Sequence, residues 1–295
     1  MGAAPGSVTS PATMPEWVIG RRGLQSLLDV LDDAGYDVRG PVVHDGTITA
    51  MPIDGVDQLP TGVTLDQAPG RVELGPTGRP TSFSWASPPQ AWKPIVHPPE
   101  TTTAVGRRVE SDGRTPSHVE MVPVAEPARR RPLALVGLRP CDAAALRRLD
   151  TVLVDRATFP DVGYEHRRRG TLTVVVDCAR PADTCFCAST GDGPHVGSDP
   201  TGVDIELTEF DAESGDVGHP VRYLVRAHSE RGAAMVSAIP QARRRLADDD
   251  DRARRELQRD TSAESQSRRI PTLDQLRAAG DREEHPVWDE VAQRC

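Results

Sequence analysis

The chain is poor in several features that would mark other classes of protein. Aromatic residues make up 4 % of its 295 residues, and Lys93 is the only lysine among 35 Lys and Arg residues. No stretch approaches the roughly 20 apolar residues of a membrane-spanning helix, and the first residues lack the charged-then-apolar order of a secretory signal. We therefore expect a cytoplasmic protein without a membrane contact, whose core is built from Val, Leu, Ala and Ile.

Charge and motif content exclude further classes. The formal net charge of -9 at pH 7 argues against nucleic-acid binding, because phosphate recognition needs clustered positive potential. The sequence has neither a GxGxxG run nor a Walker loop, so no nucleotide site is expected. Its eight histidines form no His-x3-His or His-Glu-x2-His pair, which argues against a histidine-based catalytic metal. No residue is nominated as catalytic.

Three parts are expected along the chain. Residues 1–15 are rich in Ala, Gly, Ser, Thr and Pro and are interpreted as a disordered lead-in. Residues 16–240 are expected to form an α/β domain. Residues 241–295 are expected to form a helical linker, in which a highly charged helix over residues 248–266 faces solvent.

Residue spacing predicts the elements of the first half of the chain. Leucines at helical spacing over residues 24–31, with Gly35 as C-cap, predict a short amphipathic helix, and a strand is expected at residues 47–53. Residues 55–132 are crowded with Pro and Gly, which indicates irregular structure and short edge strands. Within them, SFSWASPPQAWKPIVHPPET (residues 82–101) is interpreted either as a clamp packed on the domain surface or as a lid or docking strap over a cofactor.

The clearest local signal is a strand–helix–strand pattern. The runs LALVGL (residues 133–138) and TLTVVVD (residues 171–177) are typical of buried parallel strands. A leucine-faced helix lies between them, with Asp142 placed to cap its N-terminus. Such a βαβ unit makes its two strands parallel. With further strands expected at residues 203–209 and 222–227, the sequence predicts an α/β fold, with α+β elements at the N-terminus and a mixed sheet.

Four of the five cysteines occupy related positions. Cys141 follows the first buried strand, at the N-terminus of the crossover helix, and Cys178 follows the second strand. Because parallel strands bring their carboxyl ends to one edge of a sheet, these two thiols are expected to meet there. Cys185 and Cys187 come from the loop after Cys178, in the spacing Cys-x6-Cys-x-Cys, and can fold back over the same edge.

Several features favour a metal centre at this edge. Cytosolic cysteines are rarely disulfide partners, and a helix N-terminus beside Cys141 favours thiolates. Arg139 and Arg180 could offset the gathered negative charge, and Gly191 and Gly193 leave room for a bulky inorganic core. We therefore expect the four cysteines to bind a 4Fe-4S cluster that serves electron transfer.

Other interpretations of the cysteines stay open. They could be buried structural thiols without a ligand, a thiol redox switch, or the ligands of a structural zinc, although zinc sites usually show a Cys-x2-4-Cys knuckle. In the zinc case the chain would be an assembly module, with residues 82–101 as its docking surface.

These motifs carry a family resemblance. The runs GLRPCDAAALRRLD, VVVDCARPADTCFCASTGDGP, VDIELTEF and YLVRAHSERG resemble the iron-sulfur beta subunit of cytoplasmic sulfhydrogenases and its close relative, the iron-sulfur electron-transfer component of anaerobic sulfite reductase. WKPIVHPPETT is similar to the stretch that precedes these motifs in that family, so the likeness spans roughly residues 92–295.

The resemblance implies both a role and a ligand set. The role is that of a non-catalytic iron-sulfur subunit of a multisubunit oxidoreductase, of hydrogenase or of sulfur or sulfite reductase type. It would relay electrons between two other subunits, one that binds flavin and NAD(P) and one that is catalytic. Position by position, the likeness implies Cys141, Cys178, Cys185 and Cys187 as the cluster ligands.

The chain departs from the family pattern at its end. HPVWDEVAQRC resembles the segment that leads into a ferredoxin-like domain, of which Cys295 would be the first ligand. The Cys-x2-Cys-x2-Cys-x3-Cys-Pro runs of that domain are missing. We therefore expect residues 241–295 to lead to a domain that another chain supplies, or the chain to be a truncated remnant of such a subunit.

Overall fold

A computed structural model of the chain describes residues 14–68, 70–88, 92–102, 104–111, 117–123, 131–210, 221–280 and 286–293. Almost all of the lead-in expected at residues 1–15 lies outside these ranges, as does Cys295.

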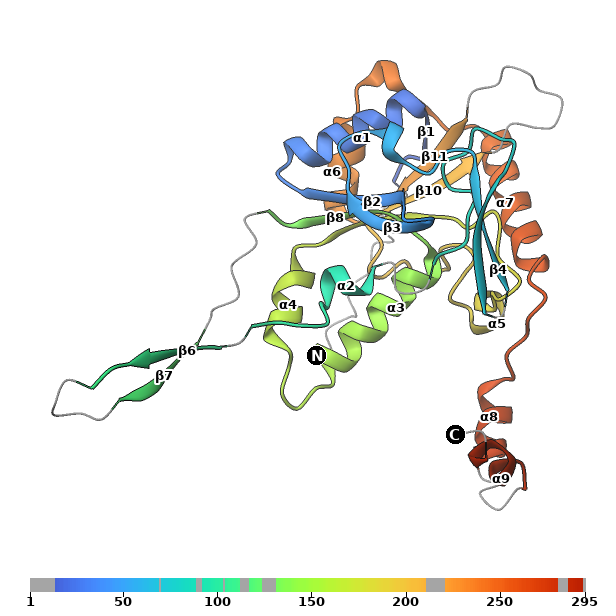
Figure 1. The fold of residues 1–295 in the computed structure, drawn as a ribbon. Coiled ribbons are helices and arrows are strands. Elements are labelled where there is room, and N and C mark those ends of the chain that lie inside the picture. The colour runs from blue at the N-terminus through green and yellow to red at the C-terminus, as the bar shows by residue number, and fades with distance from the viewer. Residues whose placement is uncertain are drawn as a thin grey trace, which may run out of the picture.

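The described residues form a mixed α/β fold around one large mixed sheet (Figure 1). Its four central strands run parallel to one another, and all other neighbouring pairs in it are antiparallel. The strand order is β12 (Arg244–Leu246), β1 (Trp17–Gly20), β11 (Arg222–Ala227), β10 (Ile205–Phe210), β9 (Leu172–Val176), β8 (Leu133–Leu138), β2 (Asp37–His44) and β3 (Thr47–Pro52). The five strands expected from the sequence are confirmed; β1, β2 and β12 were not predicted.

Helices cover both faces of the sheet (Figure 1). One face carries α1 (Arg21–Asp33) and α6 (Glu230–Ala238), and the other carries α2 (Lys93–Val96), α3 (Pro140–Asp150) and α4 (Val162–Arg169). Successive residues of β8 alternate between these layers: Ala134 and Val136 pack on the side of α1, and Leu133 and Leu135 on the side of α3. A strand buried on both faces is apolar throughout, which explains the continuous LALVGL run.

The remaining helices and helical turns are short or lie at the margins of the fold. They are α5 (Cys187–Thr190), α7 (Asp249–Glu264), α8 (Leu273–Gly280), α9 (Val287–Ala292), the 3-10 turns Val56–Gln58 and Gln241–Arg243, and the π-helical turn Thr151–Asp155. No helix in the described part of the chain is both long and apolar enough to cross a bilayer.

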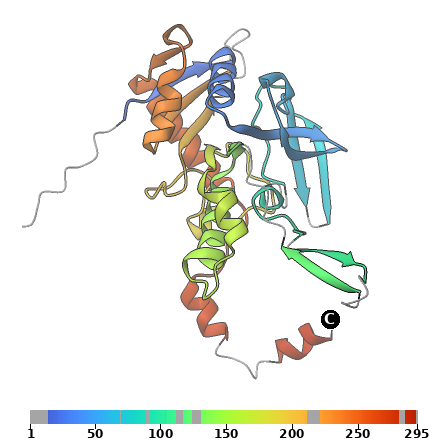
Figure 2. The same cartoon turned by 90° about the vertical axis from the view of Figure 1, so that its left-hand side faces the viewer.

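Two hairpins occupy the Pro- and Gly-rich region. β4 (Val63–Ala68) pairs with β5 (Arg71–Pro76), and β6 (Ala104–Val109) pairs with β7 (His118–Pro123). The expectation of short edge strands is met here, since each strand is six residues long and forms an edge of its own two-stranded sheet. Neither hairpin extends the main sheet. The β6–β7 hairpin projects away from the body in two perpendicular views (Figures 1 and 2).

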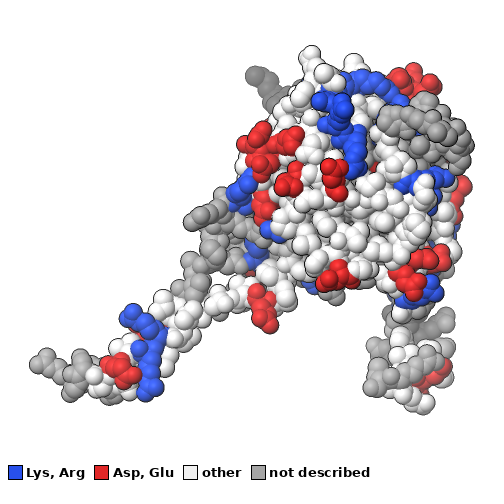
Figure 3. Space-filling model, turned by 45° about the horizontal axis from the view of Figure 1, so that its top comes forward, with Lys and Arg blue, Asp and Glu red and all other residues white. Residues whose placement is uncertain are grey.

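Charged side chains on the viewed face are of mixed sign (Figure 3). Several are paired at the surface: on the projecting hairpin Arg107 meets Glu120 at 3.5 Å and Arg108 meets Glu110 at 3.3 Å. Such exposed pairs contribute little to stability. The forces that position the site described below therefore come from buried contacts.

Strand β8 contains a bulge near its C-terminal end. The register with β9 shifts between Val136 and Leu138, and the intervening Gly137 has φ +95°, in the left-handed region. A methyl group at this position would lie 3.0 Å from Pro41 Cδ and 3.1 Å from Phe83 Cε1. Bulges redirect the strand that carries them, and this one stands four residues before Cys141.

We expect Gly137→Ala to lower the free energy of unfolding by about 1–3 kcal/mol, because the added methyl is both strained and crowded. Urea unfolding of the full chain measures this change. Gly197→Ala is the matched control, since a methyl group there meets nothing within 4 Å and the residue does not lie in the left-handed region. Equal losses in the two variants would contradict the explanation.

Candidate metal centre

The four predicted cysteines come from three neighbouring segments. Cys141 is the second residue of α3, which begins directly after β8 and Arg139. Cys178 follows the end of β9 by two residues, and β9 is the parallel neighbour of β8. Cys187 opens α5, and Cys185 lies two residues earlier. All four are free thiols.

The structure brings these four thiols together. Cys141 donates a hydrogen bond to the sulfur of Cys187, and the charge of Cys178 also acts on Cys141. Cys178 in turn is influenced by the charges of Cys185 and Cys187, and Cys185 by that of Cys187. Cys141 and Cys187 are therefore in direct contact, and Cys178 and Cys185 lie near enough for the charges of other cysteines to act on them.

Their pKa values reflect burial and these mutual interactions. Burial raises the pKa of Cys178 to about 12 and also raises that of Cys185. The pKa of Cys141 is raised first by the hydrogen bond that it donates to Cys187 and then by burial. The pKa of Cys187 is lowered to about 7, because it accepts that hydrogen bond and another from Gln266. Four thiolates here would repel one another, so a bound cation would be needed to hold them all in that state.

Arg139 supplies positive charge beside the thiols. Its side chain is fully buried, and its charge lowers the pKa of Cys178 and of Cys185. Arg180 was expected to offset the negative charge of the thiolates. In the structure it instead lowers the pKa of Cys178 through a backbone hydrogen bond. Arg139 is therefore the arginine whose charge acts at the site.

The same arginine anchors the tryptophan-containing segment. One terminal nitrogen donates to Phe83 O and to Trp85 O, each at 2.6 Å, and the other donates to Asp177 O at 3.2 Å and Val176 O at 3.4 Å. The guanidinium carbon lies 4.3 Å from the centre of the Trp85 ring. Arg139 thus joins this segment to the end of β9.

The segment around Trp85 is an interior clamp. Phe83, Trp85 and Trp92 are at most 3 % exposed, so their rings are packed inside the domain. This corrects the expectation of a surface clamp for residues 82–86 and Trp92, whereas Lys93, Pro94 and residues 99–101 are exposed. The alternative, a lid or docking strap over a cofactor, stays a prediction. Residues 89–91 lie outside the described ranges.

The N-terminus of α3 is tied to the same clamp. Asp142 accepts from Arg139 N at 2.8 Å, and Ser87 Oγ donates to Asp142 Oδ1 at 2.8 Å. The predicted capping by Asp142 is confirmed in this form: the carboxylate acts from the third helical position, and Arg139 is the N-cap residue. Cys141 is thereby held between two anchored neighbours.

Glu209 holds the clamp from the opposite side. This residue of β10 accepts hydrogen bonds from Ser82 N at 2.7 Å and Phe83 N at 2.8 Å. Burial raises its pKa from an ordinary value of 4.5 to about 7, although these two hydrogen bonds and the charge of Arg139 oppose the rise. No local pattern in the sequence pairs Glu209 with residues more than 120 positions away.

The raised pKa of Glu209 has a consequence for stability. Between pH 4.5 and 7 the folded state keeps a proton that the unfolded chain releases, so this residue makes the free energy of unfolding fall as pH rises. Glu209→Gln stays neutral. Its free energy of unfolding, relative to the wild type, should therefore rise by up to about 3 kcal/mol between pH 4 and pH 8 in urea titrations.

Glu206, on the same strand, provides a matched variant, because its pKa is shifted in the opposite direction to that of Glu209. Burial raises its pKa, but the hydrogen bond from His228 and the charges of Arg255 and Arg226 outweigh burial and hold the pKa at about 2. Its charge therefore stabilises the fold fully above pH 4.5, and this contribution is lost as pH falls toward 2. Glu206→Gln should have a lower free energy of unfolding than the wild type at pH 8. If the free energies of unfolding of the two variants, relative to the wild type, changed with pH in the same direction, at least one of the two pKa assignments would be wrong.

The helix α7 contributes to the site in a way that the sequence did not indicate. Ser262 donates to Cys178 O, and Gln266, just beyond the helix, donates to Cys187 Sγ at 3.2 Å. Arg255 donates to Glu206 at 3.0 Å, and all three side chains are at most 4 % exposed. The expectation of a solvent-facing helix is therefore wrong for this face.

Gly193 allows close approach of the chain to the thiols. A methyl group on it would lie 3.0 Å from Cys187 Sγ and 3.6 Å from Pro140 Cβ. Gly191 meets no such neighbour, and its requirement is conformational, because it ends α5 with φ +74°. Of the two glycines, Gly193 is thus the one at which the chain passes close to a cysteine sulfur.

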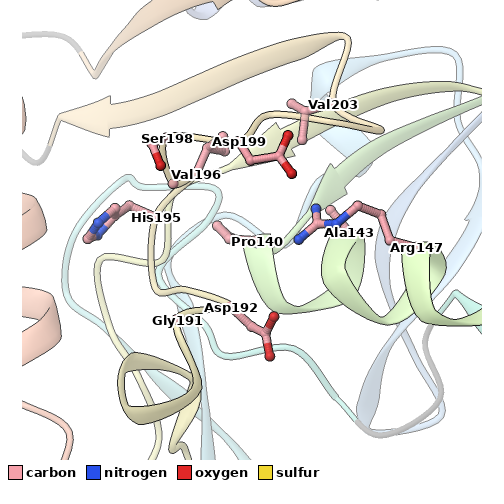
Figure 4. A pocket seen from close by; sticks show the side chains of 11 residues that line it. Pro140, Ala143, Arg147, Gly191, Asp192, His195, Val196, Ser198, Asp199 and Val203 are labelled. Carbon is pink, nitrogen blue, oxygen red and sulfur yellow. The ribbon is translucent and has the colours of Figure 1, made fainter.

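A cavity of about 300 Å³ is lined by Pro140, which precedes Cys141 in the chain, and by Gly191 and Asp192, which follow α5 (Figure 4). Arg147 reaches in from α3, and the ring of His195 points away. Asp192 is already paired with Arg148 at 2.7 Å. The walls thus present both signs of charge.

The thiols are not a preformed site for one ion. Throughout the described ranges, no group of three or more His, Cys, Asp or Glu side chains is arranged to hold a metal ion. Four thiolates around one zinc lie roughly 3.8 Å apart, as Zn–S bonds of about 2.3 Å in a tetrahedron require. In a four-iron cluster each thiolate binds a different iron atom, so the sulfurs are spaced more widely.

Comparison of the chain with models of protein families, with curated proteins and with solved structures gives no match. The function is therefore inferred from the residues of this chain.

Proposed function

We propose that the chain is an electron-transfer protein in which Cys141, Cys178, Cys185 and Cys187 hold a 4Fe-4S cluster at the carboxyl ends of β8 and β9. The observation that supports the proposal is a contact between thiols of two separate segments: Cys141 donates a hydrogen bond to Cys187, and Cys178 and Cys185 lie near enough for the charges of other cysteines to act on them.

The surroundings of the thiols fit such a group. Thiolates are the ligands that iron-sulfur clusters use, and the buried positive charge of Arg139 acts on two of the four. Backbone and amide N–H groups face two of the sulfurs: Ala182 N lies 3.3 Å from Cys185 Sγ, and Gln266 Nε2 lies 3.2 Å from Cys187 Sγ. The bound cluster would accept and release single electrons.

The place of the protein in a larger assembly follows from the motif resemblance alone. On that basis we propose a component of a cytoplasmic oxidoreductase of hydrogenase or of sulfur or sulfite reductase type. It would pass electrons between two other subunits, one that binds flavin and NAD(P) and one that is catalytic.

Metal analysis of anaerobically purified protein tests the proposal. We expect about four iron and four acid-labile sulfide per chain, with an EPR signal that appears when dithionite reduces the protein. A fully folded preparation without iron would overturn the proposal. Stoichiometric zinc with no EPR signal would favour the structural alternative instead.

A further inference from the structure

Gln266 occupies an unusual place for an amide side chain. It is 3 % exposed and follows α7 by two residues, next to the short helix that Cys187 opens. A buried amide must satisfy both its oxygen and its nitrogen, because an unpaired polar group costs free energy. Its two partners therefore reveal what it does.

Both partners belong to α5. The amide oxygen accepts from Ala188 N at 3.0 Å, and the amide nitrogen donates to Cys187 Sγ at 3.2 Å. Because Ala188 N can only donate, the oxygen must face it, and this fixes the amide orientation with the N–H group toward the sulfur. A second contact, from Ile270 N to Ser189 Oγ at 3.1 Å, ties the following chain to the same helix.

A donor held against a ligand sulfur has a defined electrostatic effect. Reduction adds an electron, and part of that negative charge resides on the sulfurs. An N–H dipole aimed at sulfur stabilises the more negative state, so it favours the reduced form. We propose that Gln266 is a positioning residue that raises the reduction potential of the centre by donating its amide N–H to Cys187. This inference rests on the proposed function.

Two substitutions separate the donor from the packing. Gln266→Glu keeps an oxygen for Ala188 N but offers the sulfur no N–H and adds negative charge. Gln266→Leu removes both contacts with little change in volume. Gln258→Leu is the matched control, because Gln258 lies on α7, the helix that precedes Gln266, and its amide nitrogen has no hydrogen-bond partner among the described residues.

The experiment is an EPR-monitored redox titration of the anaerobically purified full chain. We expect the midpoint potential to shift to more negative values in both Gln266 variants and to stay at the wild-type value in Gln258→Leu. Unchanged or raised potentials in the Gln266 variants would overturn the inference. Loss of iron from Gln266→Glu would also overturn it, because the amide would then be needed to form the site rather than to tune it.

The outcome for the wild type distinguishes the two proposals. If wild-type protein binds no iron, the proposed function fails. If it binds iron and its potential does not depend on Gln266, only the inference fails.

Discussion

Cys178→Ser is expected to abolish cluster binding, leaving less than roughly a tenth of the wild-type iron. Cys178 is the most buried of the four cysteines, at 8 % exposure. Its main-chain oxygen is held by Ser262 and its N–H by Pro194 O at 2.8 Å. No water or neighbouring residue could readily take the place of a ligand fixed in this way. Iron and sulfide analysis with the visible absorption spectrum measures the loss.

The fifth cysteine provides the control for this experiment. Cys295 lies outside the described residues and outside the proposed ligand set, so Cys295→Ser should keep the full iron content. Equal iron in Cys178→Ser and in the wild type would exclude Cys178 as a ligand. Equal losses in both variants would mean that the ligand set is wrongly assigned.

Arg139→Leu should produce the second large effect, a fall of about 3–5 kcal/mol in the free energy of unfolding. The guanidinium donates to four carbonyl oxygens, two of them at 2.6 Å. Leucine would leave these acceptors buried and unpaired, and would remove the cation from the face of Trp85. Urea unfolding of the full chain is the measurement.

Two further variants test whether the loss of stability in Arg139→Leu comes from the hydrogen bonds of the buried guanidinium. Arg139→Lys should not restore stability, because an ammonium group cannot reproduce a planar fork that serves both the clamp and the end of β9. Arg148→Leu should cost less than about 1 kcal/mol, since Arg148 pairs with Asp192 while 69 % exposed. Similar losses for Arg139→Leu and Arg148→Leu would contradict the central role of Arg139.

The sequence predicted the elements whose signals are local. Five strands and the leucine-spaced helix α1 were expected from runs and spacing confined to a few residues. The prediction for α1 holds because Leu24, Leu27, Leu28 and Leu31 all face the core. Gly35, expected as its C-cap, lies two residues beyond the helix with φ +87°. In each case one short window carried all the information.

Features that depend on distant partners could not be predicted in this way. Glu209 on β10 and Arg139, the residue between β8 and α3, clamp the segment around Trp85. No sequence pattern near either residue indicates its partner. The charge of α7 concealed its buried face, because Arg255 is buried by pairing with Glu206 rather than by being apolar. The projecting hairpin β6–β7 follows from a pairing that a Pro- and Gly-rich composition does not specify.

X-ray absorption at the iron edge of reduced and oxidised protein tests the central claim most directly. If the four thiols share one cluster, each iron should be surrounded by sulfur alone, with other iron atoms as the next neighbours. Iron bound by nitrogen or oxygen, or iron without a second iron nearby, would contradict the account.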